Sequence, residues 1–286
     1  MTNDILTMQF LSETISLSNT VFTLLRDLIQ ERTGIYYETS NRDLLADKLL
    51  PCAIACGLTS FLDYYYLLKY DDTAEEEWNR VINAVSVQET FFWREIDQIK
   101  TLVEVLVPEY FATSRITPLK IWSAACSTGE EPLTIAMALN ESGLLRRVPI
   151  EIYASDASQN AIAKAKQGLY QERSFRNTSP TMQTKYFSKE PEGWRVDPEL
   201  HSQIKWTKAN LMVETEIKHL ATASIIFCRN VFIYFSQNNI RKTVSLFYEA
   251  MPTPGYLCIA ASESLLKLTT DFELQEIGGA FVYVKR

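Results

Sequence analysis

The first third of the chain places apolar residues at helical intervals, separated by residues that start or stop helices. This pattern predicts helices over residues 19–29, 41–50, 59–70 and 73–84, with the Asn19-Thr20 pair as the cap of the first. Gly34 is expected to end the first helix, and Pro51 to end or kink the second. The aromatic and leucine repeats within these helices are typical of stripes that face a core. We therefore expect a small all-α domain over residues 1–86.

From Leu119 onward, short apolar runs alternate with helical stretches. The runs lie at residues 119–122, 150–154, 224–228 and 256–260. Such alternation is typical of an α/β fold in which helices cover both faces of a mostly parallel sheet. A final pair of runs, 272–274 and 281–284, predicts an antiparallel strand pair at a sheet edge. We expect this second domain to span residues 87–286.

The alternation breaks between Gly168 and Ile204. Short strand-like pieces surround the turn Pro191-Glu192-Gly193, at residues 186–187, 194–196 and 204–206. They predict an inserted β-hairpin element, a small β-subdomain near residues 168–206.

Charge and composition exclude several classes of function. The 286 residues carry a formal charge of −7, which argues against a nucleic-acid partner, because phosphate neutralisation dominates such binding. No run of about 18 apolar residues exists, and the start lacks a basic signal region, so we expect a cytoplasmic protein without membrane insertion. The five cysteines are expected to be reduced thiols. Cys52 and Cys56 lack a full set of partners for zinc, so no metal is expected.

The segment from Ile121 to Pro132 is the strongest candidate for a ligand site. An apolar strand runs into small residues, including Ala124, and then into a helix that opens with Glu130 and Glu131. Gly129 is the only glycine present, whereas a dinucleotide loop needs several to approach a pyrophosphate. S-adenosylmethionine fits better, because acidic residues tolerate its ammonium group. The alternative is an ordinary helix start, with residues 128–131 as a capping box.

Polar residues also follow the other predicted strands. Asp156 comes after the second strand, where a carboxylate can bind the two hydroxyls of a ribose; alternatively, it or Ser158 caps the next helix. Polar Arg229, Asn230 and Tyr234 lie at the carboxyl end of a later strand, where α/β folds bind ligands. The structural alternatives are that the asparagine only makes a turn and the tyrosine only packs. The pair Asn210-Leu211 is a candidate to face an adenine.

The segment joining the two domains, Gln88 to Glu95, carries three consecutive aromatic residues beside Thr90 and Arg94. These side chains could wall a ligand cleft between the domains, since domain interfaces are a preferred place for ligands. The alternative is a hydrophobic linker that packs against both domains.

Taken together, four ordered motifs resemble the chemotaxis receptor methyltransferases, the CheR family. Thr90 to Arg94 is similar to the family's N-x-T-x-F-F-R, and Trp122 to Pro132 to its W-S-A-A-x-S-T-G-E-E-P. Residues 154–156 are similar to its A-S-D, and residues 228–235 to its C-R-N-V-x-I-Y-F. The resemblance implies an all-α N-terminal domain and a Rossmann-like methyltransferase domain with a small β-subdomain insert.

The resemblance also implies an activity: transfer of a methyl group from S-adenosylmethionine to glutamate side chains of a chemoreceptor-like membrane protein, leaving S-adenosylhomocysteine. The enzyme would be a protein-glutamate O-methyltransferase, expected as a monomer, acting on the receptor's cytoplasmic helical region. Arg94 and Tyr234 would lie near the reacting centre. The residues implied to contact the cofactor are Gln88, Thr90, Arg94, Ala124, Glu131, Asp156, Asn210, Leu211, Arg229 and Asn230.

Two features depart from the family pattern. The first motif begins with Gln88 where the family has Asn, one methylene shorter. Receptor-methylating members commonly present basic residues on the second helix, whereas residues 50–56 here are uncharged, and residues 1–80 hold six Lys and Arg against thirteen Asp and Glu. The alternative function is therefore a non-catalytic, cofactor-binding scaffold or signalling protein of the same fold. Methylation of a small molecule or a nucleic acid is a third candidate.

Overall fold

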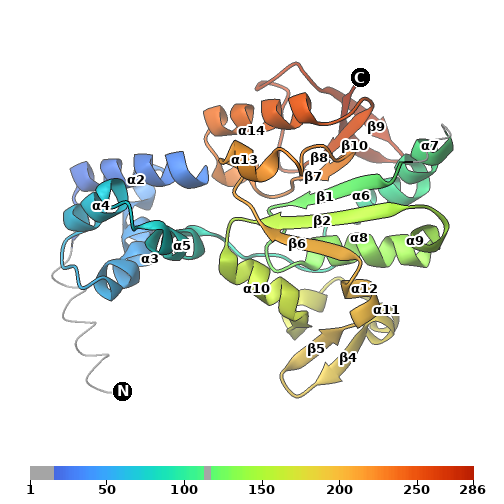
Figure 1. The fold of residues 1–286 in the computed structure, drawn as a ribbon, viewed down its shortest axis with the longest axis horizontal. Helices are drawn as coiled ribbons and strands as arrows, with labels where there is room; N and C mark the ends of the chain where they lie inside the picture. Colours follow the sequence, from blue (N-terminus) through green and yellow to red (C-terminus); the bar gives the residue numbers. More distant parts are fainter. Residues whose placement is uncertain (1–15, 113–116) are drawn as a thin grey trace. The chain divides into compact units, whose positions relative to one another are not determined.

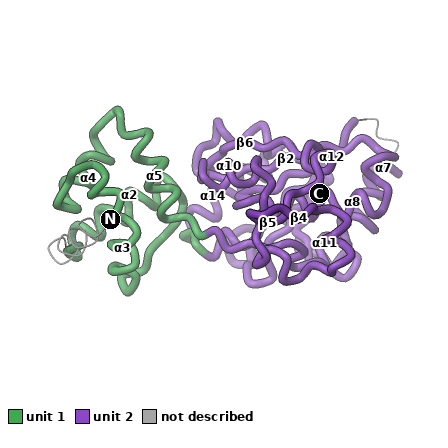
Figure 2. Tube along the Cα trace, turned by 90° about the horizontal axis from the view of Figure 1, so that it is seen from below, with its two compact units in different colours: residues 1–87, 234–236 green, residues 88–233, 237–286 purple. Residues whose placement is uncertain are grey.

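The computed structural model describes residues 16–112 and 117–286. These residues form two compact units, shown in separate colours in Figure 2. The first comprises the described residues up to Val87 together with residues 234–236, and the second comprises the described residues of 88–233 and residues 237–286. No helix within these described ranges is both long and apolar enough to cross a membrane.

The first unit is helical, as predicted. Its elements are α2 (Asn19–Thr33), the short 3-10 turn η1 (Thr39–Asn41), α3 (Arg42–Ala55), α4 (Phe61–Tyr70) and α5 (Glu75–Val85). The Ser60 side chain caps α4 by accepting from the backbone N–H groups of Leu62 and Asp63. Gly34, with φ of 81°, ends α2 in the left-handed conformation, as expected. The buried face of each helix contributes to one core, with Leu25, Ile29, Leu45 and Leu49 fully enclosed.

The cap of α2 was predicted wrongly, and of the two alternatives given for Pro51 the structure excludes an end of the helix. Ser18, not the Asn19-Thr20 pair, caps α2 through its side chain. Helix α3 continues through Pro51 to Ala55, so the proline does not end it. Pro51 has no N–H group, so the carbonyl of Asp47 lacks its helical hydrogen bond. Both residues are exposed. Water can therefore satisfy that carbonyl, and the lost hydrogen bond does not have to break the helix.

Residues 234–236 belong to the first unit although they lie far along the chain. The Tyr36 backbone N–H donates to the Tyr234 carbonyl at 2.8 Å, and Ile35 forms an isolated bridge with Phe235. A Cβ atom on Gly34 would lie 2.5 Å from the Phe235 ring. Glycine is therefore required at position 34 both by its backbone angle and by this close contact.

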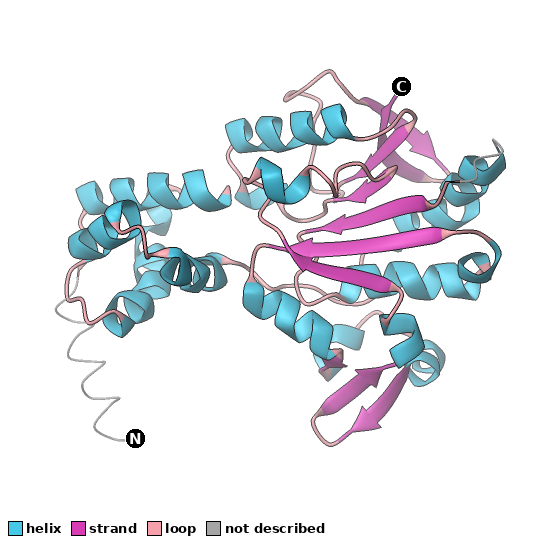
Figure 3. Ribbon diagram, viewed as in Figure 1, coloured by secondary structure: helices cyan, strands magenta, loops and turns pink. Residues whose placement is uncertain are grey.

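The second unit is built on a seven-stranded sheet with the order β6-β2-β1-β7-β8-β10-β9 (Figures 1 and 3). Its strands are β1 (Leu119–Ala124), β2 (Ile150–Asp156), β6 (Ile204–Lys208), β7 (Ile225–Phe227), β8 (Gly255–Cys258), β9 (Glu273–Ile277) and β10 (Ala280–Lys285). The first five are parallel, and β10 pairs antiparallel with β8 and β9. The predicted α/β class and the closing antiparallel pair are confirmed.

Helices cover both faces of this sheet. Before β1 come α6 (Ile96–Thr101), the π-helical η2 (Leu102–Leu106) and α7 (Val107–Ala112), and the later helices are α8 (Glu130–Glu141), α9 (Leu144–Arg147), α10 (Gln159–Gln167), α13 (Glu214–Ile217) and α14 (Gln237–Ala250). Ile121 of β1 shares a core with apolar residues of α8. The next residue, Trp122, points to the opposite face and packs on Phe247 of α14, with ring centroids 5.3 Å apart.

A second, smaller sheet lies in the predicted insert. It has the order β3-β5-β4, formed by β3 (Leu169–Tyr170), β4 (Phe187–Glu190) and β5 (Gly193–Val196), with η3 (Glu172–Phe175), α11 (Pro180–Tyr186) and α12 (Pro198–His201) around it. The assignment of residues 204–206 to the hairpin was wrong, because they begin β6, which pairs with β2. This strand is at the edge of the main sheet, so its exposed lysines hide the continuous apolar pattern that marks a buried strand.

Candidate functional site

The loop after β1 has the tight backbone that its small residues suggested. Ala125, Ser127 and Gly129 have φ values of 53°, 51° and 97°. The Cys126 backbone N–H donates to the Ser155 carbonyl at 2.8 Å, which ties the loop to the end of β2. A Cβ atom on Gly129 would lie 2.8 Å from the Trp206 ring. The single glycine of the motif is therefore required where the loop turns into α8.

Asp156 lies at the end of β2 and holds two backbone groups. Its Oδ2 accepts from the Ser127 N–H at 2.9 Å, and its Oδ1 accepts from the Ser158 N–H at 2.8 Å. The cap of α10 is Ser158, whose hydroxyl accepts from the Ala161 N–H at 3.0 Å. Each Asp156 oxygen has a second lone pair, so the carboxylate can still accept two hydroxyl groups.

Burial raises the pKa of Asp156 above its usual value of 3.8, although the two backbone N–H groups partly offset this by stabilising the charged form. A bound cation nearby would favour the charged form further. The site is therefore suited to a positively charged ligand with neighbouring hydroxyls.

Glu131 does not form the capping box that residues 128–131 allowed. Its Oε1 accepts from the Ser123 hydroxyl and its Oε2 from Arg229 Nε, both at 2.6 Å. The Thr128 hydroxyl instead donates to Glu130 at 2.7 Å. Glu131 thus joins the end of β1 to the loop after β7.

Arg229 connects this pair to the segment before α6. Its Nη2 donates to the Arg94 carbonyl at 2.9 Å and its Nη1 to the Glu95 carbonyl at 3.0 Å. Only 3% of its side chain is exposed, compared with 13% for Glu131. All three nitrogens of the guanidinium donate hydrogen bonds to protein groups, so Arg229 holds Glu131, Arg94 and Glu95 in place.

The segment from Gln88 to Glu95 lies alongside these loops within the second unit. Gln88 contacts α10, donating to the Ser158 hydroxyl at 3.5 Å and accepting from Lys164 at 3.2 Å. Arg94 donates to the Glu89 carbonyl at 2.9 Å. Thr90 is half-buried, while Phe92 is fully enclosed in the core of the second unit. The central aromatic residue thus packs within that core.

The remaining predicted residues follow β6 and β7. The Ala209 N–H donates to the Asp156 carbonyl at 3.0 Å, which places the start of the Asn210-Leu211 pair beside Asp156. Both residues of the pair are buried, and Asn210 Oδ1 accepts from the Met212 N–H at 3.0 Å. After β7, the Asn230 side chain donates to Glu95 at 3.4 Å.

Strained backbone is concentrated in these same loops. In the described ranges, the non-glycine residues with positive φ are Trp93, Glu95, Ala125, Ser127 and Asn230. Such conformations cost free energy and persist where the surroundings hold them, which is commonly at functional sites. The structure thus joins the predicted residues of the second unit, from Gln88 to Asn230, through linked loops. Tyr234 belongs to the first unit.

Two charged residues of the site, Glu95 and Glu263, were not proposed as ligand contacts from the sequence, and Glu130 was noted there only as part of the acidic helix start. Glu95 and Glu263 accept hydrogen bonds from the loops after β7 and β8. Glu130 is buried and accepts from Ser174 at 2.9 Å; this burial raises the pKa of its carboxyl. The rule that identified Asp156, an acidic residue soon after a buried strand, would also have found Glu263.

These residues fit S-adenosylmethionine. Buried carboxylates surround the loop after β1, which favours a cationic ligand over a phosphate. The Ser127 hydroxyl is buried and has no hydrogen-bond partner in the described part of the protein, so it is available to a ligand. Within that same part, no cluster of three or more potential metal ligands occurs.

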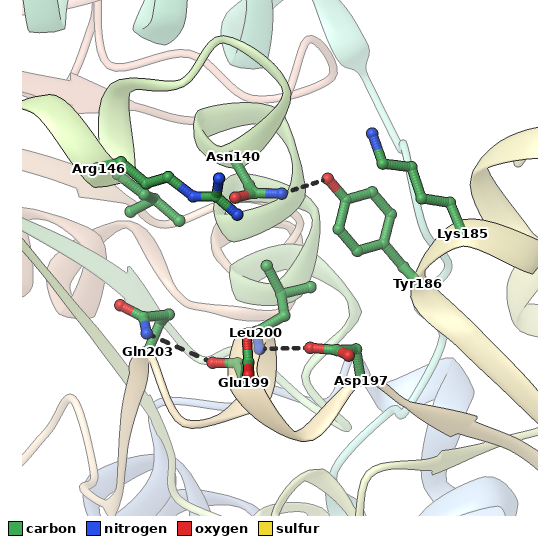
Figure 4. A pocket seen from close by; sticks show the side chains of 9 residues that line it. Asn140, Arg146, Lys185, Tyr186, Asp197, Glu199, Leu200 and Gln203 are labelled. Atoms are coloured by element: carbon green, nitrogen blue, oxygen red, sulfur yellow. Dashed lines mark hydrogen bonds between the residues drawn. The ribbon is translucent and has the colours of Figure 1, made fainter.

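A pocket of about 300 Å³ lies elsewhere in the second unit (Figure 4). It is lined by residues of α8, α9, α11 and α12, by Gln203 after α12, and by none of the predicted site residues. Its polar groups largely bind one another: Asn140 donates to the Tyr186 hydroxyl at 2.8 Å, and the Leu200 N–H to Asp197 at 2.8 Å. This pocket is therefore separate from the candidate cofactor site.

Comparison with known proteins agrees with this geometry. Residues 20–86 match the family model described as CheR methyltransferase, all-alpha domain, and residues 88–280 match CheR methyltransferase, SAM binding domain. Chemotaxis protein methyltransferase 2 of Vibrio cholerae serotype O1 is 34% identical over 95% of this chain and 94% of its own length. Chemotaxis protein methyltransferase of Escherichia coli K12 is 30% identical over 93% of this chain and 91% of its own.

Among solved structures, magnesium protoporphyrin IX methyltransferase from Synechocystis PCC 6803 with bound SAM matches 79% of this chain and 96% of its own. Its sequence is 14% identical and the TM-score is 0.34.

Proposed function

The chain belongs to the CheR methyltransferase family, and from this premise we propose that it methylates glutamate side chains of a chemoreceptor-like membrane protein. The modified glutamates would lie on the receptor's cytoplasmic helical region and become methyl esters. The domain that spans residues 88–280 is a SAM-binding domain, so the methyl donor is S-adenosylmethionine.

One observation supports the cofactor half of the proposal above all others. Asp156 uses Oδ2 to hold Ser127 of the strained loop after β1 and Oδ1 to hold Ser158 at the start of α10, and it keeps a second lone pair on each oxygen for a ligand. We assign the ribose hydroxyls to this carboxylate. The proposed contacts around the rest of the cofactor are Gln88, Thr90, Arg94, Ala124, Glu131, Asn210, Leu211, Arg229 and Asn230.

The chemistry requires positioning more than acid or base catalysis. S-adenosylmethionine supplies a methyl group already activated by the sulfonium. A glutamate side chain, with a pKa of about 4.3, is already ionised at neutral pH, so no general base is needed. The protein then has to hold the carboxylate in line for displacement and to exclude water. We propose that Arg94 orients the substrate carboxylate and that Tyr234 donates a hydrogen bond near the reacting atoms.

The acidic first unit supports a second candidate, a cofactor-binding scaffold without methyl transfer. The arginines in described residues 16–86 all form ion pairs with neighbouring carboxylates of the same unit. Lys48 donates to backbone carbonyls near the end of α5. Few cations thus remain to dock an acidic receptor surface. This candidate predicts cofactor affinity without turnover.

Calorimetric titration with S-adenosylmethionine and S-adenosylhomocysteine tests the cofactor site. We expect the native protein to bind both, and Asp156→Ala to bind at least about tenfold more weakly, because charged hydrogen bonds to the ligand are lost. Asp63→Ala, at an exposed position of the first unit, is the control. Base-labile methyl esters on receptor fragments would then support the enzyme, and their absence despite sound binding would favour the scaffold.

A further inference from the structure

Glu263, which follows β8, accepts hydrogen bonds from an unusual number of backbone groups. Its Oε1 accepts from the N–H groups of Val231 at 2.8 Å and Ile233 at 3.2 Å. Its Oε2 accepts from Asn230 at 3.1 Å and Ala260 at 2.8 Å. A carboxylate has about four acceptor positions, so these four donors saturate it.

Three of the four donors belong to the loop after β7. This loop opens with Arg229 and Asn230, and Asn230 has a φ of 60°. A left-handed conformation costs a non-glycine residue free energy unless surrounding groups hold it. Glu263 forms no ion pair within the described ranges. Burial raises the pKa of its carboxyl, and the backbone N–H groups partly offset this by stabilising the charged form. Its carboxylate therefore acts as the centre around which the loop is folded.

The same network extends toward Arg94. The Glu95 carboxylate accepts from the Asn230 side chain at 3.4 Å and from the Ala261 N–H at 3.1 Å. Arg229 holds the carbonyls of Arg94 and Glu95 from the other side. Residues 94–95, 229–233 and 260–263 are thus joined by hydrogen bonds, and a change at Glu263 reaches the proposed cofactor contacts.

We propose that Glu263 is a positioning residue for cofactor binding, which acts by holding the loop that carries Asn230. The inference rests on the proposed function, because it assumes that Asn230 contacts the cofactor. It assigns Glu263 no contact with the substrate or with the reacting atoms.

Two substitutions separate this role from simple packing. Glu263→Gln preserves the size of the side chain but replaces one acceptor oxygen with an NH2 group, which faces N–H donors and cannot bind them. Glu263→Asp is one methylene shorter but keeps both acceptor oxygens. If Glu263 acts by accepting hydrogen bonds from the N–H groups, the aspartate variant should bind S-adenosylhomocysteine more tightly than the glutamine variant. If only the volume of the side chain matters, the glutamine variant should bind more tightly. Glu276→Gln, at an exposed position of β9, is the matched control.

The measurements are the dissociation constant for S-adenosylhomocysteine by calorimetry, the melting temperature without ligand, and amide hydrogen exchange. We expect Glu263→Gln to raise the dissociation constant about tenfold or more, Glu263→Asp to raise it less, and the control to leave it unchanged. Exchange should accelerate at the N–H groups of Asn230, Val231, Ile233 and Ala260 in the glutamine variant while the strands β1 and β2 stay protected.

The results distinguish this inference from the proposed function. If the native protein binds the ligand and the glutamine variant binds within twofold of it, the inference is wrong and the proposed function stands. A glutamine variant that binds better than the aspartate variant would also overturn it, because packing would then be the role. If the native protein binds no cofactor, the proposed function fails and the inference fails with it.

Discussion

The buried ion pair between Arg229 and Glu131 offers the sharpest test of how the second unit holds its site. In Arg229→Met, Glu131 keeps the Ser123 hydroxyl but loses its only ion-pair partner in the described chain, at a position where 13% of its side chain is exposed. The carbonyls of Arg94 and Glu95 lose their donors as well. The substitution thus leaves one carboxylate without its cation and two carbonyl groups without the Arg229 donors.

Removing one partner of a buried ion pair costs about 3–5 kcal/mol, because the other charge remains desolvated. We therefore expect Arg229→Met to lower the free energy of unfolding of the second unit by that amount. In Glu131→Gln the amide can still accept one hydrogen bond, so a loss of about 1–3 kcal/mol is expected. The double variant should be more stable than the sum of the single losses predicts, by at least about 1 kcal/mol, because neither charge is then left unpaired.

Urea unfolding followed by tryptophan fluorescence gives the four stabilities of this cycle, since Trp93, Trp122, Trp194 and Trp206 all lie in the second unit. Lys218→Met, which breaks an exposed pair with Glu214, is the control and should change little. Additive losses in the double variant, or a loss in Arg229→Met no larger than in the control, would refute the idea that this pair braces the site.

Three further outcomes are expected. Gly129→Ala should destabilise the second unit by about 1–3 kcal/mol and weaken S-adenosylhomocysteine binding, because its φ of 97° and the Trp206 ring exclude a Cβ atom; normal unfolding and binding would contradict this. S-adenosylhomocysteine affinity should fall on acidification at a pH above 3.8, the usual Asp156 value, because burial raises the pKa of this carboxyl and the protonated form loses acceptors. Because the pKa of Asp156 is raised in the folded protein, protonation of this carboxyl stabilises the folded state relative to the unfolded one, and the loss of affinity cannot come from unfolding caused by Asp156. In Asp156→Asn, the pH profile of affinity measured by calorimetry should lack this step. Ser60→Ala should lower the urea stability of the first unit by about 1 kcal/mol, because Ser60 caps α4, and an unchanged midpoint would contradict the role of the cap.

The predictable parts of the fold depended on local patterns. Helical periodicity and caps sufficed for α2 to α5, because one face of each helix enters a core. Continuous apolar runs sufficed for β1, β2, β7 and β8, which lie between other strands of the main sheet. The edge strand β6 was placed wrongly because its exposed side gives it a mixed pattern, and only its pairing with β2 shows where it belongs.

The sequence by itself determined the fold class and pointed to the residues of the candidate cofactor site, because small residues, a carboxylate after a strand and ordered motifs are local features of the chain. Only the tertiary structure decided which groups of the chain those side chains pair with. It showed that Ser158 rather than Asp156 caps α10, and that Glu131 pairs with Arg229 instead of forming a capping box. It also showed that Glu263 joins the loops after β7 and β8 by accepting hydrogen bonds from both. Such partners lie far apart in the sequence, 98 positions for Glu131 and Arg229 and 166 for Glu95 and Ala261, and folding alone brings them within hydrogen-bond distance.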